Sequence, residues 1–316
     1  MWISGKFNMK FKNIIILILI IFLCSGKLFA EDKDSAQTEN KAEKITLSGY
    51  GEKGEKRWDL NSETADVNFE KNVKLVNPDA VLYKDGNVDV KLKAKEGEYD
   101  RSTDNVHLRK DVVVEEKLGA VMQTNSVQWN AKTSLITSNE QVRITRENAV
   151  LTGDKVVIDR VKETGEVKEN VKIKSINADE KKHPTIITCE GKMVVKYQNY
   201  TAEFYDNVVV ADTSATLKAD YIRISLNDET LAVESVYCKG HVFIVQGDKR
   251  ATSNEAVYNA VEGTIVLTED PKLMKSENLL GADKIIFFIK DERVVCEPKA
   301  RLIIYPSEED KKLFEL

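Results

Sequence analysis

The chain has few of the residues that build metal sites, cofactor sites or disulfide frameworks. Its 316 residues include four cysteines, three histidines and five prolines. No Cys-x-x-Cys pair occurs and the histidines are far apart, so the sequence predicts neither a metal nor a cofactor. Because proline is scarce and Val, Ile, Thr and Tyr recur in alternating runs, the composition favours strands over helices. We expect an all-β protein.

Only one long hydrophobic run is present, and it lies near the start of the chain. It extends from Ile14 to Cys24 after three lysines, and the small residue Ala30 follows at a suitable cleavage position. The run is about ten residues long, whereas a membrane-spanning helix needs about 20. We therefore predict that residues 1–30 are a cleaved signal peptide. An uncleaved anchor is the alternative, and a lipoprotein attached through Cys24 is disfavoured because Leu23 precedes it.

The remaining cysteines, Cys189, Cys238 and Cys296, are an odd number in an exported chain. All three lie among strand residues, so we expect buried unpaired thiols, with a single disulfide as the alternative.

The chain also lacks an excess of positive charge. Its net charge is −5, and it is near −9 without residues 1–30, which carry four lysines and no acidic residue. Such a chain should not bind nucleic acid. An anionic lipid would be held by apolar contact or by a local basic patch, because the overall field repels it.

Two polar segments divide the chain beyond the signal peptide. Residues 31–44 are polar and of mixed charge, which predicts a solvated tether. A second polar segment at 177–184 contains Pro184, which cannot donate to a sheet ladder. We therefore predict β domains at 45–176 and 185–307, a linker at 177–184 and a tail at 308–316.

A four-residue phrase recurs about every 30 residues, which is the spacing of a repeat architecture. It consists of an aliphatic residue, any residue, a small residue and a polar residue. The copies are Leu92–Lys95, Met122–Asn125, Leu151–Asp154, Ile187–Glu190, Leu217–Asp220, Ala251–Asn254 and Leu280–Asp283. An alternating stretch follows each copy, so the phrase is interpreted as the start of a β-hairpin.

Glycine-containing and polar segments between alternating stretches predict turns. They are Asp85–Asn87, Glu96–Glu98, Asn139–Glu140 and Thr164–Glu166. Such turns suit antiparallel pairing, and a parallel β-helix is the alternative architecture.

The two halves resemble two parts of one family. The second half resembles the OstA-like family in Ile187–Met193, Thr201–Val208, Leu217–Asp220, Val245–Ala251 and Leu280–Ile285. The first half resembles the membrane-tethered C component of the same lipopolysaccharide-transport pathway in Trp58–Leu60, Ala94–Tyr99 and Leu151–Asp154. The chain thus resembles a fusion of an LptC-like and an LptA-like module.

This resemblance implies an open, twisted antiparallel β-jellyroll built from repeated hairpins in two stacked modules. It implies a periplasmic protein, with an N-terminal tether to the inner membrane as the alternative, that binds lipopolysaccharide and carries the acyl chains of lipid A in an apolar groove. The transport would run from the inner to the outer membrane for outer-membrane assembly. The implied partners are transport proteins of both membranes, reached through edge-strand stacking, and an end-to-end homo-oligomer is a further possibility.

Alternation predicts which apolar side chains point inward and line the groove. In the second half they are Met193, Val195, Tyr197, Phe204, Val208, Val210, Ile222, Ile224, Leu226, Val242, Ile244, Ile285 and Phe287. In the first half they are Val90, Leu92, Val106, Leu108, Trp129, Val142, Ile144, Val156 and Ile158. For each residue alone, ordinary core packing is the simpler explanation.

Two other functions remain open. A scaffold or adhesin would use the same repeats without binding lipid. A polysaccharide-active enzyme would need paired carboxylates in a cleft, and the available ones are Asp220, Asp248, Glu255, Asp283 and Glu297. No nucleophile elbow or phosphate loop is present, so we expect no enzymatic activity. Lys249 and Arg250 could meet lipid phosphates but are more simply a solvated turn.

Overall fold

The structure, a computed structural model, describes residues 41–67, 72–117, 119–175, 184–276, 278–291 and 293–304. These residues form 26 strands and one 3-10 turn, η1 (Tyr197–Asn199). The pairings whose register is defined are all antiparallel. The predicted antiparallel all-β class is confirmed, and the parallel β-helix alternative is wrong.

The predicted signal peptide, the tail 308–316 and all of the linker except Pro184 lie outside the described residues. Strand β1 begins at Lys41, inside the stretch predicted as a tether. In the part of the chain that is described, no helix is long and apolar enough to span a membrane.

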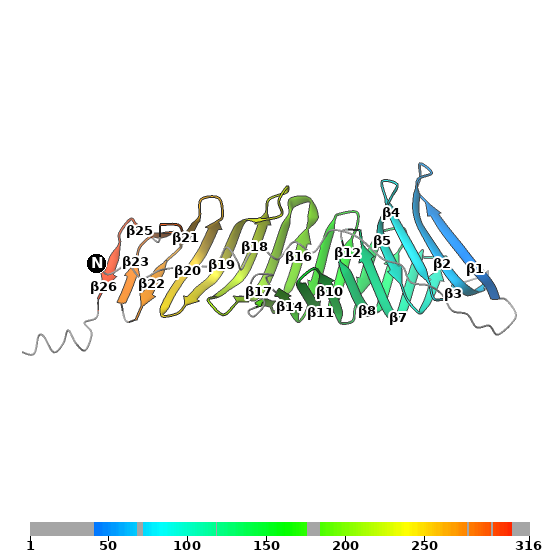
Figure 1. The fold of residues 1–316 in the computed structure, drawn as a ribbon, viewed down its shortest axis with the longest axis horizontal. Coiled ribbons are helices and arrows are strands. Elements are labelled where there is room, and N and C mark those ends of the chain that lie inside the picture. The colour runs from blue at the N-terminus through cyan, green and yellow to red at the C-terminus, as the bar shows by residue number, and fades with distance from the viewer. Residues whose placement is uncertain are drawn as a thin grey trace, which may run out of the picture. The chain divides into compact units, whose positions relative to one another are not determined.

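Contacts divide the described chain into two units. The N-terminal unit comprises 41–173 and 194–198, and the C-terminal unit comprises 174–193 and 199–304. The described chain passes between the units at three points, which lie in β14, in β16 and in η1. Figure 1 shows that strands run side by side across each unit and are joined mostly by short turns.

The strands of the N-terminal unit are β1 (Lys41–Tyr50), β2 (Lys56–Val67), β3 (Asn72–Val76), β4 (Asp79–Lys84), β5 (Asn87–Lys93), β6 (Glu96–Asp100), β7 (Asn105–Glu116), β8 (Val121–Asn130), β9 (Leu135–Ser138), β10 (Val142–Arg146), β11 (Ala149–Gly153), β12 (Lys155–Asp159), β13 (Thr164–Lys168) and most of β14 (Val171–Ser175) and β16 (Lys192–Lys196).

The strands of the C-terminal unit are β15 (Thr185–Cys189), β17 (Thr201–Ala211), β18 (Thr216–Leu226), β19 (Val233–Gln246), β20 (Lys249–Asn259), β21 (Thr264–Thr268), β22 (Lys272–Lys275), β23 (Asn278–Gly281), β24 (Lys284–Phe288), β25 (Arg293–Glu297) and β26 (Arg301–Ile303).

Each unit has two layers of paired strands, which we call its walls. The long strands contribute to both walls. In β7, residues 105–109 pair with β6 and residues 113–116 pair with β5. In β20, residues 249–252 pair with β22 and residues 255–259 pair with β21. One strand therefore contributes its first half to one wall and its second half to the other. This arrangement is the jellyroll that the resemblance implied.

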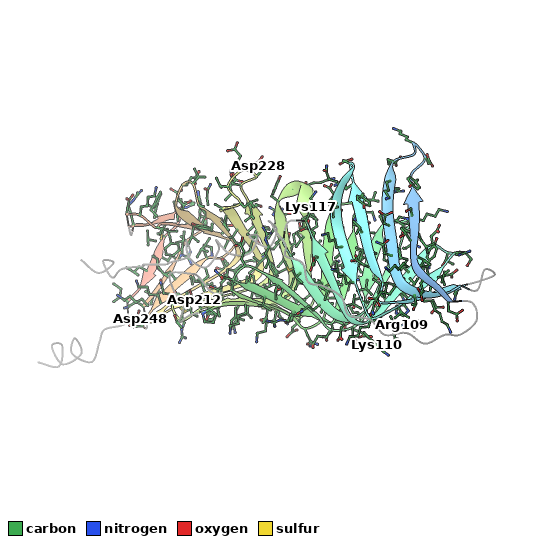
Figure 2. The ribbon with its side chains drawn as sticks, turned by 45° about the vertical axis from the view of Figure 1, so that its right-hand side comes forward. Arg109, Lys110, Lys117, Asp212, Asp228 and Asp248 are labelled. Carbon is green, nitrogen blue, oxygen red and sulfur yellow. The ribbon has the colours of Figure 1, made fainter. Side chains whose placement is uncertain are left out.

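The change of wall occurs at a bulge with left-handed backbone. In β7, Lys110 and Asp111 have φ values of 64° and 52° where the register shifts. Asp206 and Asn207 do the same in β17, with φ values of 63° and 47°. A bulge leaves residues unpaired and bends the strand. Figure 2 shows Lys110 at the side of its unit opposite Lys117, which follows the end of β7.

The repeated phrase lies at this bend. Its last residue contacts the next bend along the sheet. The backbone N–H of Glu190 donates to the carbonyl of Asp206 at 2.9 Å, and the Asn207 side chain donates to the Glu190 carboxylate at 2.7 Å. The equivalent partners of other copies are Lys95 with Lys110 and Asp111, Asp154 with Glu169 and Asn170, Asp220 with His241, Asn254 with Glu269, and Asp283 with Pro298 and Lys299. We call this series the corner contacts.

Two copies of the phrase lie near the start of the first strand of a hairpin, as predicted. Leu217–Asp220 lies inside β18 and Ala251–Asn254 lies inside β20. These hairpins turn after the strand that contains the phrase. There an Asp or Asn side chain accepts backbone N–H groups two and three residues ahead, as Asn259 does from Val261 and Glu262 at 3.0 and 3.1 Å. This is the Asx-turn geometry, and Asp159 and Asn227 repeat it.

We predict that Gly240→Ala destabilises the fold more than Gly247→Ala. Both glycines have positive φ, 76° and 58°, so each substitution strains the backbone. A β-carbon at Gly240 would also lie 2.8 Å from Asp220 Cγ at the corner, whereas one at Gly247 meets nothing within 4 Å. We expect a loss of about 2–3 kcal/mol at Gly240 and about 1 kcal/mol at Gly247 in urea unfolding. Equal losses would show that crowding at the corner contact does not change the free energy of unfolding.

Candidate functional site

The predicted inward side chains of the C-terminal unit form continuous rows across the strands. In one wall, the residues that lie opposite one another are Phe204, Ile222, Cys238, Ala256, Leu267, Ile285 and Cys296. In the other wall they are Val210, Leu217, Ile244, Ala251, Leu273, Leu280 and Leu302. No charged or polar side chain other than a cysteine thiol interrupts either row.

Exposure rises along both rows toward the last strands. Ile222 is fully buried, whereas Cys296 in β25 is only partly buried and Leu302 in β26 is 58% exposed. Strands β25 and β26 have defined pairings only with β24 and β23. The apolar inner face of the C-terminal unit therefore reaches its edge without being covered there by another described strand.

The N-terminal unit has the same kind of rows. One consists of Leu47, Leu60, Ala80, Leu92, Val114, Met122, Ile144 and Leu151. The other contains Val106, Trp129, Ile136 and Ile158. Trp129 also makes an edge-to-face contact with Trp58, with ring centroids 5.5 Å apart, an arrangement that aromatic pairs favour.

Most of the predicted groove residues are buried. The exceptions are partly exposed: Ile144, Ile158, Val195 and Tyr197. The sequence interpretation missed Leu60, Met122, Leu217 and Leu267, which lie in the same rows. The signal for two of them was available, because Met122 and Leu217 are the aliphatic residues that begin a repeated phrase.

The carboxylates considered for catalysis lie at corners, at turns or on the outer face. Asp220 contacts His241 at 2.8 Å, Asp283 contacts Lys299 at 3.3 Å, and Glu297 contacts Lys284 at 3.6 Å. Glu255 accepts a hydrogen bond from Tyr237, and Asp248 is exposed in the turn between β19 and β20. Figure 2 shows Asp248 and Asp212 on one side of the C-terminal unit and Asp228 on the other. Among the described residues, no cluster could hold a metal ion.

Both halves of the chain match known protein families. The family model of LptC-related lipopolysaccharide-assembly proteins matches residues 13–176, more than half of the chain. The chain belongs to the LptC-related lipopolysaccharide-assembly family. A second model, of the LptA and LptD N-terminal lipopolysaccharide-transport proteins, matches residues 190–293. The predicted order, an LptC-like half followed by an LptA-like half, is confirmed.

Several solved structures are similar to this family member, and one of them matches it over part of its length. It is LptH, the LptA-homologous periplasmic component of the lipopolysaccharide-transport device of Pseudomonas aeruginosa. The match has 17% identity, covers 35% of this chain and 89% of that chain, and has a TM-score of 0.32, so no conclusion rests on it. None of the curated proteins compared with the chain matches it.

The three thiols in the described part of this LptC-related chain are free and differ in burial. Cys189 and Cys238 are buried, and Cys296 is partly exposed at the edge. Burial raises the pKa of Cys189 to about 11 and that of Cys238 to about 12, and it also raises the pKa of Cys296. A raised pKa lowers the thiolate fraction, which is the reactive form.

We predict that iodoacetamide modifies Cys296 first when the pH is near the ordinary thiol pKa of about 8.5. Cys238 and Cys189 should react at least about tenfold more slowly, because both thiolate formation and access are suppressed. Peptide mass mapping over time measures all three rates in one sample. The same chain in urea is the control, since the three rates should converge there. Fast labelling of Cys238 in folded protein would contradict its place in the inner row.

Proposed function

We propose that this protein carries lipopolysaccharide through the periplasm, with the acyl chains of lipid A held against the inner faces of its two units. The observation that supports this function is the set of apolar rows, which cross successive strands without a charged residue. Apolar contact contributes about 0.8 kcal/mol per buried methylene and has no preferred direction. A lipid with several chains can therefore be held firmly and still slide from strand to strand.

The lipid would enter by separating the walls at their turns. Ile222 and Leu267 have no exposed surface, so an acyl chain reaches them only where it replaces contacts between the walls. The corner contacts hold the strands together during this movement, because they are hydrogen bonds and ion pairs at the bend. Opening then exchanges one apolar neighbour for another, and the free-energy cost per strand stays small.

We further propose that the edge strands join this chain to other transport modules or to a second copy. Strand β1 has a defined pairing only with β2, and β25 and β26 leave backbone groups and apolar side chains uncovered by described strands. Unpaired edges accept further strands readily. Such pairing would continue the inner rows into the next module.

The first experiment tests the lipid. A photoreactive residue is placed at Ile222 in one variant and at Lys218 in another, in chains expressed in a lipopolysaccharide-producing host. Both positions lie in β18, but Ile222 is buried in the row and Lys218 is exposed on the opposite face. We expect a lipid A adduct at Ile222 and none at Lys218. If folded protein gives no adduct at Ile222, the rows are an ordinary core, and the interpretation as a scaffold is favoured.

The edge is tested by Leu302→Lys. A lysine on an edge strand opposes strand addition, because its charge would be placed at the joint. We expect this variant to lose concentration-dependent association in light-scattering measurements. The matched control is Val261→Lys, which adds the same charge at a turn residue that is 77% exposed. Equal loss in both variants would indicate a general effect of charge rather than pairing at the edge.

A further inference from the structure

The N-terminal unit contains a cavity that the apolar rows do not explain. It has a volume of about 100 Å³ and is lined by Arg57 and Trp58 of β2, Tyr83 and Lys84 of β4, Trp129, Ala131 and Ser134 around the β8–β9 turn, and Arg160 and Val161 of the β12–β13 turn. Three of these side chains are cationic. The two tryptophans are buried, so one side of the cavity meets the inner face of the unit.

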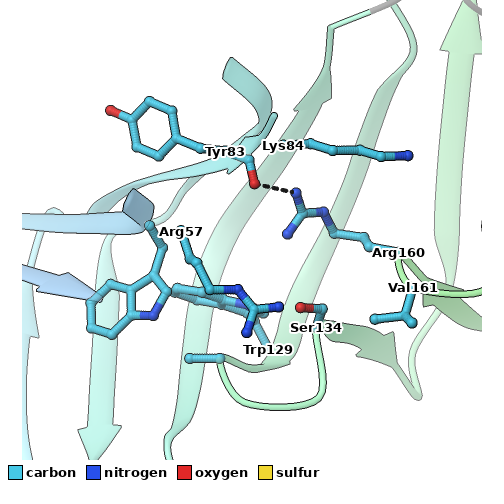
Figure 3. A pocket seen from close by; sticks show the side chains of 9 residues that line it. Arg57, Tyr83, Lys84, Trp129, Ser134, Arg160 and Val161 are labelled. Carbon is cyan, nitrogen blue, oxygen red and sulfur yellow. Dashed lines mark hydrogen bonds between the residues drawn. The ribbon is translucent and has the colours of Figure 1, made fainter. Parts of the chain in front are cut away.

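Arg160 is held rigidly at the wall of this cavity. Its Nε and Nη2 donate to Asp89 Oδ2 at 2.9 and 2.6 Å, and Nη2 also donates to the Tyr83 carbonyl at 3.2 Å. The Nη1 hydrogens have no acceptor among the described residues. Figure 3 shows the guanidinium of Arg160 facing the space above Ser134. A fixed guanidinium with free N–H groups is suited to an oxyanion, because little side-chain freedom is lost on binding.

Arg57 supplies a second guanidinium on the other side of that space. Its side chain is exposed and forms no ion pair or hydrogen bond with any described residue. Figure 3 shows it pointing toward the Ser134 hydroxyl. The other cations are partly neutralised, since Lys84 pairs with Glu163, and Asp89 pairs with both Arg160 and Lys117. An unneutralised arginine therefore remains beside the cavity in a chain whose overall charge is negative.

We propose that this cavity binds a phosphate group, supplied by the headgroup of the lipid that the inner face carries. The inference rests on the proposed function for the source of the phosphate. Arg57, Arg160 and the Ser134 hydroxyl donate to the phosphate oxygens. A space of about 100 Å³ suits one compact anionic group and not a whole acyl chain. The adjoining tryptophans place the apolar part of the same molecule at the inner face.

The experiment measures binding of three probes to the full-length chain: lipid A with its phosphates, dephosphorylated lipid A and inorganic phosphate. The first test variant is Arg57→Gln, which removes the unpaired charge. The second is Arg160→Lys, which keeps a positive charge beside Asp89 but removes the planar, multiply donating guanidinium group. Arg143→Gln is the matched control, because Arg143 is an exposed arginine of β10 in the same unit.

We expect the wild type to bind phosphorylated lipid A about tenfold more tightly than the dephosphorylated form, as a charge-assisted pair predicts. Arg57→Gln and Arg160→Lys should remove most of this preference, and Arg143→Gln should keep it. Binding of dephosphorylated lipid A should be the same in all four proteins.

Equal binding of both lipids by the wild type would overturn the phosphate site and leave the proposed function standing. If inorganic phosphate binds in an Arg57-dependent manner but neither lipid binds, the headgroup assignment and the proposed function both fail, and the cavity takes a free anion. If no probe binds, both proposals are overturned.

Discussion

The corner contacts are the constraint on which the rest of the structure depends. A flat antiparallel sheet buries one face only by meeting another layer, whereas a strand bent at a two-residue bulge can supply both layers itself. The bend leaves backbone groups unpaired, and the polar residue of the preceding phrase pairs with them, as Glu190 does with Asp206 and Asn207. Each bent strand needs a corner contact at its bulge. The repeated phrase therefore recurs at the spacing between one bent strand and the next.

The same constraint explains which predictions from the sequence were correct. Alternation depends only on which face of a strand is buried, so the strands and most inward residues could be predicted. The position of the bend could not, because a small residue followed by Asp or Asn is typical of hairpin turns as well. Two glycines were assigned to the wrong kind of element for a similar reason. Gly97 and Gly165 were predicted in turns but lie within β6 and β13. A β-carbon at Gly97 would lie 3.0 Å from Pro78 and 3.2 Å from Leu108, and one at Gly165 would lie 3.2 Å from the Tyr197 hydroxyl.

The candidate site was predictable only in part, for a related reason. An inward position can be inferred from local sequence, but a row requires the register of strands far apart in the chain, such as Ile222 opposite Cys238 and Leu267 opposite Ile285. The cavity near Arg57 was beyond prediction. Its cations come from β2, from β4 and from the β12–β13 turn, and nothing local links Arg57 to Arg160 before the fold brings them to one cavity.

The division between polar bend and apolar interior has a consequence for movement. Separating the walls removes apolar contacts that have no direction, whereas sliding one strand past its neighbour breaks ladder and corner hydrogen bonds together. Opening of the walls, as proposed, therefore keeps these hydrogen bonds, and it would expose the inner rows from the turns inward. In the N-terminal unit, Arg57 lies just after the β1–β2 turn and Arg160 lies in the β12–β13 turn, where the proposed opening would begin. An amphiphile that enters there meets cationic groups first and apolar rows afterwards, which matches the order of its own headgroup and chains.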